Sequence, residues 1–242
     1  MMDWQAGDDS RVVLHEKQVA FVDAALSGEY RYLCYGGAIR GGKSIVACAL
    51  VYTLCRVYPG SRWAIVRENL PTLRRNTIPT LQSIQPSGVS DVHQGKWSMT
   101  CSNGSEILLF PELADSDKDL NRWRGLEVNG FVLEEASSLT PQAFSKAIER
   151  AGSWKAKGGE QPPPLIILTT NPGQGWVKRM FYEPWLAGKL MPPWFYMPST
   201  IHDNPYLDPD YLKNLEYLKV TDERAYRTFV EGDWDVSDDP YQ

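Results

Sequence analysis

A glycine-rich segment near the start of the chain carries the clearest chemical signal in the sequence. From Gly37 the residues read Gly-Ala-Ile-Arg-Gly-Gly-Lys-Ser, which fits the pattern G-x-x-x-x-G-K-[ST] in full. Glycines let backbone N–H groups approach phosphate oxygens, Lys43 offers a point charge to the β- and γ-phosphates, and the Ser44 hydroxyl is a ligand for Mg²⁺. The segment predicts a nucleotide-phosphate site made by Gly37, Ala38, Ile39, Arg40, Gly41, Gly42, Lys43 and Ser44.

Two adjacent carboxylates follow an apolar run further along the chain. Phe131 to Leu133 leads directly into Glu134 and Glu135. In enzymes with such a phosphate loop, the first acid after a buried strand supports Mg²⁺, and a neighbouring acid accepts a proton from the attacking water. We therefore expect Glu134 to support the metal and Glu135 to act as the general base. Without the phosphate loop, the two glutamates would be read as solvated acids at a strand end.

A third apolar run, Leu165 to Leu168, ends in the polar residues Thr169, Thr170 and Asn171. Ligands of open parallel sheets gather at the carboxyl ends of the strands. These three residues are candidates for sensing the γ-phosphate and coupling its loss to motion. The alternative is a simple turn that leaves the strand through Pro172.

Several arginines could neutralise the charge that develops during phosphate hydrolysis. Arg40 lies inside the phosphate loop and would act within its own chain. Arg122 and Arg124 lie on a polar loop before the acidic strand and could reach the nucleotide of a neighbouring subunit, with Arg124 the stronger candidate. Arg67, at the end of another apolar run, is a weaker candidate for contacts near the site.

A glutamine upstream of the phosphate loop is a candidate for reading the nucleobase. Gln18 lies about twenty residues before the loop, and its amide carries the donor and acceptor that adenine requires. The alternative is a surface residue of a helix.

Alternating strands and helices must position these residues, which predicts an α/β fold. We expect a P-loop NTPase of the RecA-like (ASCE) type, with a mainly parallel central sheet flanked by helices and a β-hairpin insertion around Asn103-Gly104. Strands are expected at 31–35, 62–67, 130–133, 165–169 and 194–198, the hairpin at 97–110, and helices at 14–26, 43–56, 70–84, 141–150, 176–185 and within 209–230.

Length and composition limit the classes of protein to which the chain can belong. The chain has 242 residues, of which 43% are hydrophobic, and a formal net charge of −5. This composition excludes a disordered, collagenous or coiled-coil protein, and we see neither a membrane-spanning run nor a secretory signal. The acidic balance argues against a strong solitary binder of nucleic acid, so any DNA contact would rest on a local basic patch or an assembly.

The order of these motifs resembles the ATPase half of the large terminase subunit, the motor that packages DNA into tailed bacteriophage capsids. The resemblance runs from about Leu14 to Trp234. Its most specific elements are the arginine inside the phosphate loop, the Glu-Glu-Ala-Ser segment from Glu134, and Thr-Thr-Asn-Pro from Thr169. Gly232-x-Trp234 is similar to the segment that closes this ATPase domain in the family.

The resemblance implies ATP hydrolysis with Mg²⁺, driving double-stranded DNA into a procapsid. Gln18 would contact adenine and an arginine near Arg124 would serve the neighbouring subunit. The implied partners are the portal of the procapsid, the small terminase subunit and other copies in a ring, commonly a pentamer, with a monomer in isolation and no membrane. The implied location is the cytoplasm of the infected bacterial host and, transiently, the procapsid.

The same resemblance implies a division of the chain. Residues 1–235 would form the motor domain, with a small lid-like part from about residue 175. Residues 236–242 would begin a linker to a nuclease domain, for which this chain has no room and no site. Glu134 departs from the family pattern, in which Asp is commoner. Two other functions stay open at this point, a different P-loop helicase or translocase and a non-hydrolysing, nucleotide-dependent assembly module.

Overall fold

The computed structural model describes residues 12–236, in which strands and helices alternate along the chain. The strands are β1 (Tyr32–Gly37), β2 (Arg62–Arg67), β3 (Ser98–Thr100), β4 (Glu106–Pro111), β5 (Gly130–Leu133), β6 (Leu165–Thr170) and β7 (Trp194–Ser199). The helices and helical turns are α1 (Glu16–Leu26), α2 (Lys43–Val57), α3 (Leu70–Thr72), η1 (Leu73–Thr77), α4 (Ile78–Ser83), η2 (Asn121–Gly125), η3 (Ala136–Ser138), α5 (Pro141–Arg150), η4 (Lys178–Tyr182), α6 (Glu183–Leu186), η5 (Ile201–Asp203), α7 (Pro209–Glu216), α8 (Leu218–Thr221), α9 (Glu223–Ala225) and η6 (Tyr226–Glu231).

Within the described residues the strands form one seven-stranded sheet in the order β3-β4-β2-β5-β6-β1-β7. Every neighbouring pair is parallel except β3 and β4, which form an antiparallel hairpin. Strand β6 lies between β1 and β5, so its polar end is placed between the phosphate loop and the two glutamates. All three ends lie at the same edge of the sheet because the strands run in the same direction.

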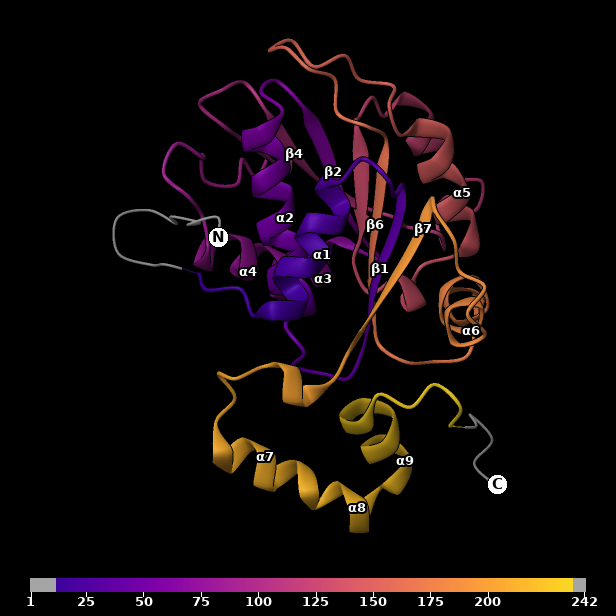
Figure 1. The fold of residues 1–242 in the computed structure, drawn as a ribbon. Coiled ribbons are helices and arrows are strands. Elements are labelled where there is room, and N and C mark those ends of the chain that lie inside the picture. The colour runs from indigo at the N-terminus through magenta and orange to yellow at the C-terminus, as the bar shows by residue number, and fades with distance from the viewer. Residues whose placement is uncertain (1–11, 237–242) are drawn as a thin grey trace.

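Helices cover both faces of the sheet, with α1, α2 and α4 on one face and α5 and α6 on the other (Figure 1). Successive strand residues point to opposite faces. In β1, Leu33 and Tyr35 enter the core under α2, whereas Cys34 enters the core under α5. Helix α2 is buried along most of its length, from Val46 to Cys55. This burial fixes the helix whose first residue is Lys43.

A small C-terminal lobe follows β7 and lies beyond the carboxyl edge of the sheet (Figure 1). Its core contains Ile201, Leu215, Tyr226 and Val230, together with Ala38 of the phosphate loop. The helical segments between residues 178 and 186 precede this lobe, and η4 packs against β7. The lobe therefore shares its core with the loop that would hold a nucleotide.

The predicted fold class is confirmed, since a mostly parallel sheet with flanking helices and a β-hairpin is present. The expected bounds of β2, β5 and α5 agree with the structure to the residue. The helix expected over 70–84 is divided into α3, η1 and α4. Pro79 lies in the first turn of α4, because proline has no N–H to continue the preceding hydrogen bonds.

The expected motor domain of residues 1–235 begins in residues that lie outside the described range, and the linker of 236–242 lies almost wholly outside it. These domain bounds and the lid-like part from about residue 175 stay predictions. Among residues 12–236, no helix is both long enough and apolar enough to cross a membrane.

Candidate active site

The phosphate loop connects β1 to α2 and passes very close to the end of β7. A Cβ added to Gly37 would lie 2.0 Å from the Ser199 carbonyl oxygen, and one added to Gly41 would lie 1.8 Å from Ser199 Oγ. Gly42, at φ +74°, takes the left-handed conformation that glycine adopts without strain. Helix α2 then begins at Lys43, so its free N–H groups face the loop and favour an anion there.

Lys43 is folded back over this loop. Its Nζ donates to the carbonyl oxygens of Gly37, at 3.1 Å, and Ala38. Burial lowers the pKa of Lys43 to about 8, while the negative charge of Glu135 opposes that shift. The lysine therefore lies near Glu135. Its ammonium is held by the two neutral carbonyl oxygens, which the charged oxygens of a phosphate would replace.

Glu134 is buried directly after β5, with an exposed fraction of 2%. One of its oxygens, Oε2, accepts a hydrogen bond from Thr77 Oγ1, and the other, Oε1, has no hydrogen-bond partner among the described residues. After burial itself, the charge of Glu134 is the second cause that raises the pKa of Cys48 on α2. Cys48 lies one helical turn beyond Ser44, on the same face of α2. Glu134 therefore faces the side of α2 that carries the Ser44 hydroxyl.

Glu135 has a left-handed backbone with φ +51°, which is uncommon for a residue with a side chain and marks local strain of about 1–2 kcal/mol. Its backbone N–H donates to Thr169 Oγ1 on β6 at 3.2 Å. Its side chain is 43% exposed, in contrast to that of Glu134. The conformation turns the carboxylate out of the sheet edge, where water can reach it.

Arg67, at the end of β2, joins the two glutamates. Its Nη2 lies 2.7 Å from Glu135 Oε2 and its Nη1 lies 3.8 Å from Glu134 Oε2, and the arginine side chain is 2% exposed. From the sequence, Arg67 was only a weak candidate for contacts near the site, because the pairing of β2 with β5 cannot be read from local patterns. The available signal was its position at the end of an apolar strand, as for the two glutamates.

The end of β6 lies beside the phosphate loop. Tyr35 is paired with Thr169 and Gly36 with Thr170 across β1 and β6. Thr169 and Thr170 are buried, and Asn171 Oδ1 is a buried atom without a hydrogen-bond partner among the described residues. The structure thus brings Thr169 next to both β1 and Glu135 and Thr170 next to Gly36, with Asn171 directly after them.

Arg40 points away from the acids and toward the C-terminal lobe. Its backbone is left-handed, with φ +58°, and its guanidinium lies 5.0 Å from the centre of the Tyr211 ring. Asn204 Nδ2 also donates to the Arg40 carbonyl oxygen at 2.8 Å. In this conformation Arg40 links the loop to the lobe and is not gathered with Lys43 and Glu135.

Gln18 is buried at the start of α1, where both ends of its amide contact backbone groups. Its Oε1 accepts from the His15 backbone N–H at 3.0 Å, and its Nε2 donates to the Gly42 carbonyl oxygen at 2.9 Å. These two bonds fix which end of the amide is oxygen and which is nitrogen. Gln18 therefore lies against the phosphate loop, and its role as a nucleobase reader stays a prediction.

Arg122 and Arg124 are exposed on η2, whose Trp123 packs against Phe110 of β4 and Phe131 of β5. The Arg122 guanidinium lies 5.5 Å from the centre of the Phe110 ring on β4. Because β4 is four strand positions from β1, that contact is roughly 19 Å from this chain's own phosphate loop. Among the described residues, neither arginine forms a hydrogen bond or ion pair with Lys43, Glu134 or Glu135.

The fold is shared with solved structures of large terminases. The large terminase of a thermophilic bacteriophage, solved in complex with ATP-gamma-S, superposes with a TM-score of 0.70 at 18% identity, covering 92% of this chain and 53% of that one. The ATPase domain of the large terminase of Thermus phage P74-26 gives 0.63 at 15% identity, covering 92% and 94%. This chain thus spans about half the length of the first of these proteins.

No curated protein sequence matches this chain. The sequence model of a protein family does match it, from residue 32 to residue 233, and that family is described as the phage terminase large subunit. The matched segment covers most of the chain and contains the phosphate loop, both glutamates and the end of β6. The chain therefore belongs to the phage terminase large subunit family.

Proposed function

We propose that this chain hydrolyses ATP and that the hydrolysis drives double-stranded DNA into a viral procapsid. The observation that carries the proposal is the meeting of Lys43, Glu134 and Glu135 at the ends of β1 and β5, in a chain of the terminase family. A loop that accepts phosphate lies beside an accessible carboxylate and a buried one. This is the minimum that water attack on a γ-phosphate requires.

The nucleotide is held from both ends. Lys43 and the N–H groups from Arg40 to Ser44 bind the phosphates. With one N–H and one oxygen lone pair still free, the Gln18 amide matches N7 and N6 of adenine. Guanine would present an oxygen to the amide oxygen, so the same geometry disfavours GTP. Adenine selection by Gln18 is part of the proposal.

The residues near Lys43 fit a magnesium ion bound with the nucleotide. Mg²⁺ takes oxygen ligands and usually combines one or two protein groups with substrate phosphates. Ser44 and the unpaired Oε1 of Glu134 are such groups, on facing sides of α2 and β5. When bound, the ion would neutralise charge on the β- and γ-phosphate oxygens. The additional methylene of Glu134, compared with Asp, lengthens the reach of this carboxylate toward the ion.

Glu135 is the group we assign to proton removal from the attacking water. Its exposed carboxylate is held by Arg67, and its backbone by Thr169. Arg67 is a positioning residue here, since its contacts run to the glutamates. Thr169, Thr170 and Asn171 then connect the reacting end of the nucleotide to β6, and loss of the γ-phosphate would be passed to that strand.

Arginine contacts to the γ-phosphate would come from two places. Arg40 can reach the nucleotide only after it leaves Tyr211. Arg124, exposed on η2, suits a site in the next subunit of a ring. The working form in this proposal is therefore a ring, taken to be a pentamer, on the portal of the procapsid.

The packaging role is the wider part of this proposal, since this chain covers 53% of the thermophilic phage relative. Double-stranded DNA, the portal and the small terminase subunit are its proposed partners, in the cytoplasm of the infected bacterium and transiently on the procapsid. A packaging reaction with procapsids, DNA, small subunit and ATP tests this role through the DNA that becomes resistant to nuclease.

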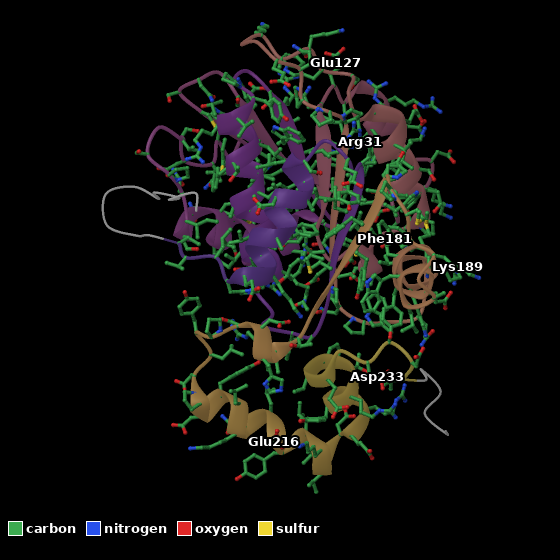
Figure 2. The ribbon with its side chains drawn as sticks, in the orientation of Figure 1. Arg31, Glu127, Phe181, Lys189, Glu216 and Asp233 are labelled. Carbon is green, nitrogen blue, oxygen red and sulfur yellow. The ribbon has the colours of Figure 1, made fainter. Side chains whose placement is uncertain are left out.

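We expect Glu135→Gln to leave the DNA sensitive to nuclease. The matched control is Glu127→Gln, because Glu127 is exposed at the opposite end of the sheet from the C-terminal lobe (Figure 2). Equal packaging by the two variants would refute the role of Glu135, and absence of packaging by the unmodified protein would refute the packaging function itself.

A further inference from the structure

A hollow of about 370 Å³ opens beside the phosphate loop, next to Gly42 and Gln18. One side is aliphatic and is formed by Val12, Val13, Ile45 and Ile84. Two residues of the C-terminal lobe, Asn204 and Tyr206, line the hollow as well. The hollow is therefore shared between the sheet domain and the lobe, and Figure 1 shows the chain that leads into α1 above the lobe segment that leads into α7.

We propose that Tyr206 stacks on the adenine of bound ATP, so that the C-terminal lobe forms one wall of the nucleobase pocket. This inference rests on the proposed function, because it assumes that the phosphate loop binds ATP. Tyr206 lies outside every motif of the sequence, in the turn between η5 and α7. Tyr206 would be a binding residue for any purine, whereas Gln18 would select among purines.

The position of Tyr206 is fixed by the phosphate loop itself. Asn204 Nδ2 donates to the Arg40 carbonyl oxygen at 2.8 Å, and the Tyr206 backbone N–H donates to Asn204 Oδ1 at 3.1 Å. A single asparagine side chain thus connects the loop to the residue that carries the ring. Closure of the loop around phosphate would move the Tyr206 backbone with it.

The lining has the character of a base pocket. An aromatic ring and an aliphatic surface can enclose the two faces of a planar base, and the amide of Gln18 lies where the polar edge of the base would be. Gly42 belongs both to the phosphate loop and to the lining of the hollow. A base bound in the hollow would therefore lie next to the loop that binds the phosphates of the same nucleotide. The Tyr206 side chain is 66% exposed, which leaves its ring free to stack.

In this arrangement the C-terminal lobe contacts bound ATP directly. ATP would contact the sheet domain through Lys43 and Gln18 and the lobe through Tyr206. Tripolyphosphate, which lacks the base and ribose, would contact the sheet domain only. This difference separates the role of Tyr206 from the role of the phosphate loop.

Calorimetric titration tests the inference with two probes in the presence of Mg²⁺, a non-hydrolysable ATP analogue and inorganic tripolyphosphate. The variants are Tyr206→Ala and Tyr206→Phe. The control is Tyr217→Ala, since Tyr217 lies on the same lobe and is 68% exposed but does not line the hollow. Both tyrosines are mostly exposed, so neither alanine variant should prevent folding.

We expect Tyr206→Ala to weaken binding of the ATP analogue by about tenfold and to leave tripolyphosphate binding unchanged. Tyr206→Phe and Tyr217→Ala should bind both probes as the unmodified chain does. Unchanged affinity of Tyr206→Ala for the analogue, or an equal loss for both probes, would overturn the stacking role. Failure of the unmodified chain to bind the analogue would instead refute the proposed function.

Discussion

Lys43 carries a positive charge in a position that disfavours it. Burial lowers its pKa from 10.5 to about 8, and the nearby Glu135 compensates only in part. Phosphate oxygens would favour the charged form and raise the pKa again. Nucleotide binding should therefore bring a proton with it whenever the free chain holds neutral lysine.

Above pH 8 we expect ATP binding to take up close to one proton per site and its affinity to fall by nearly tenfold per pH unit. Below about pH 7 the uptake should disappear, because Lys43 is already charged. Calorimetry in two buffers with different ionisation enthalpies measures the uptake. Lys43→Arg is the control, since arginine stays charged and takes up no proton; the same uptake in that variant would contradict the assignment.

The lowered pKa of Lys43 should also affect how the stability of the nucleotide-free chain depends on pH. Between pH 8 and 10.5 the unfolded chain holds the lysine proton more tightly than the folded chain does. The contribution of Lys43 to the free energy of unfolding therefore rises with pH across this range, and on acidification it is lost between pH 10.5 and 8. Comparison of unfolding curves with those of Lys43→Met isolates this contribution.

Residue types and spacing were enough to predict that the glycine-rich loop and the two glutamates lie at strand ends, because each motif follows an apolar run. They were not enough for Arg67, whose partners come from a strand more than sixty residues away. Nor could they show that Arg40 turns toward Tyr211, since that contact depends on how the lobe folds back. Tyr206 carries no local sequence signal at all.

At the scale of elements, strands were predicted best where both faces are buried. Strands β2 and β5 are continuous apolar runs between turns, and their bounds agree with the prediction. The order of the strands could not be read from the sequence, because parallel pairing joins segments that are distant in the chain. The insertion of β6 between β1 and β5, which places Thr169 beside Glu135, is visible only in the folded sheet.

The C-terminal segment is held to the sheet domain by Trp234. Its ring is 2% exposed and stacks on Tyr182 with 4.9 Å between ring centres, and its carbonyl oxygen accepts from Lys178 Nζ at 2.7 Å. Nearby Gly232, at φ +74°, packs close to Ala38 of the phosphate loop. The segment that ends the lobe is thus anchored next to the site.

We expect Trp234→Ala to lower the free energy of unfolding by about 3 kcal/mol, because it removes a buried indole from an aromatic cluster. Trp185→Ala is the matched control, since Trp185 is 37% exposed, and its loss should stay below about 1 kcal/mol. Urea denaturation followed by circular dichroism measures both. Similar losses in the two variants would show that Trp234 does not anchor the segment.

For the whole molecule, the exposed position of Arg124 on η2 has a consequence for assembly. In a ring built by head-to-tail contacts, the face that carries η2 meets a different face of the next subunit. An arginine from that face would complete the neighbour's site and leave its own chain's site incomplete. Activity would then depend on contacts between copies.

Mixing two inactive variants tests this arrangement. Arg124→Ala keeps Glu135, and Glu135→Gln keeps Arg124, so a mixed ring contains some sites with both groups. We expect each variant to be inactive alone and an equimolar mixture to recover up to about a quarter of the unmodified rate, the fraction of correctly ordered pairs. Arg122→Ala in the same assay decides between the two arginines. No recovery in either mixture would contradict a role in trans.

Hydrolysis of ATP by this chain, with Glu135 as the general base, is tested by Mg²⁺-dependent phosphate release by purified protein over a range of protein concentrations. We predict release by the unmodified chain and a loss of at least about a hundredfold in Glu135→Gln, with nucleotide binding retained by both. Binding without phosphate release by the unmodified chain at every concentration would refute hydrolysis by this chain, and an unchanged rate in Glu135→Gln would refute the role of Glu135.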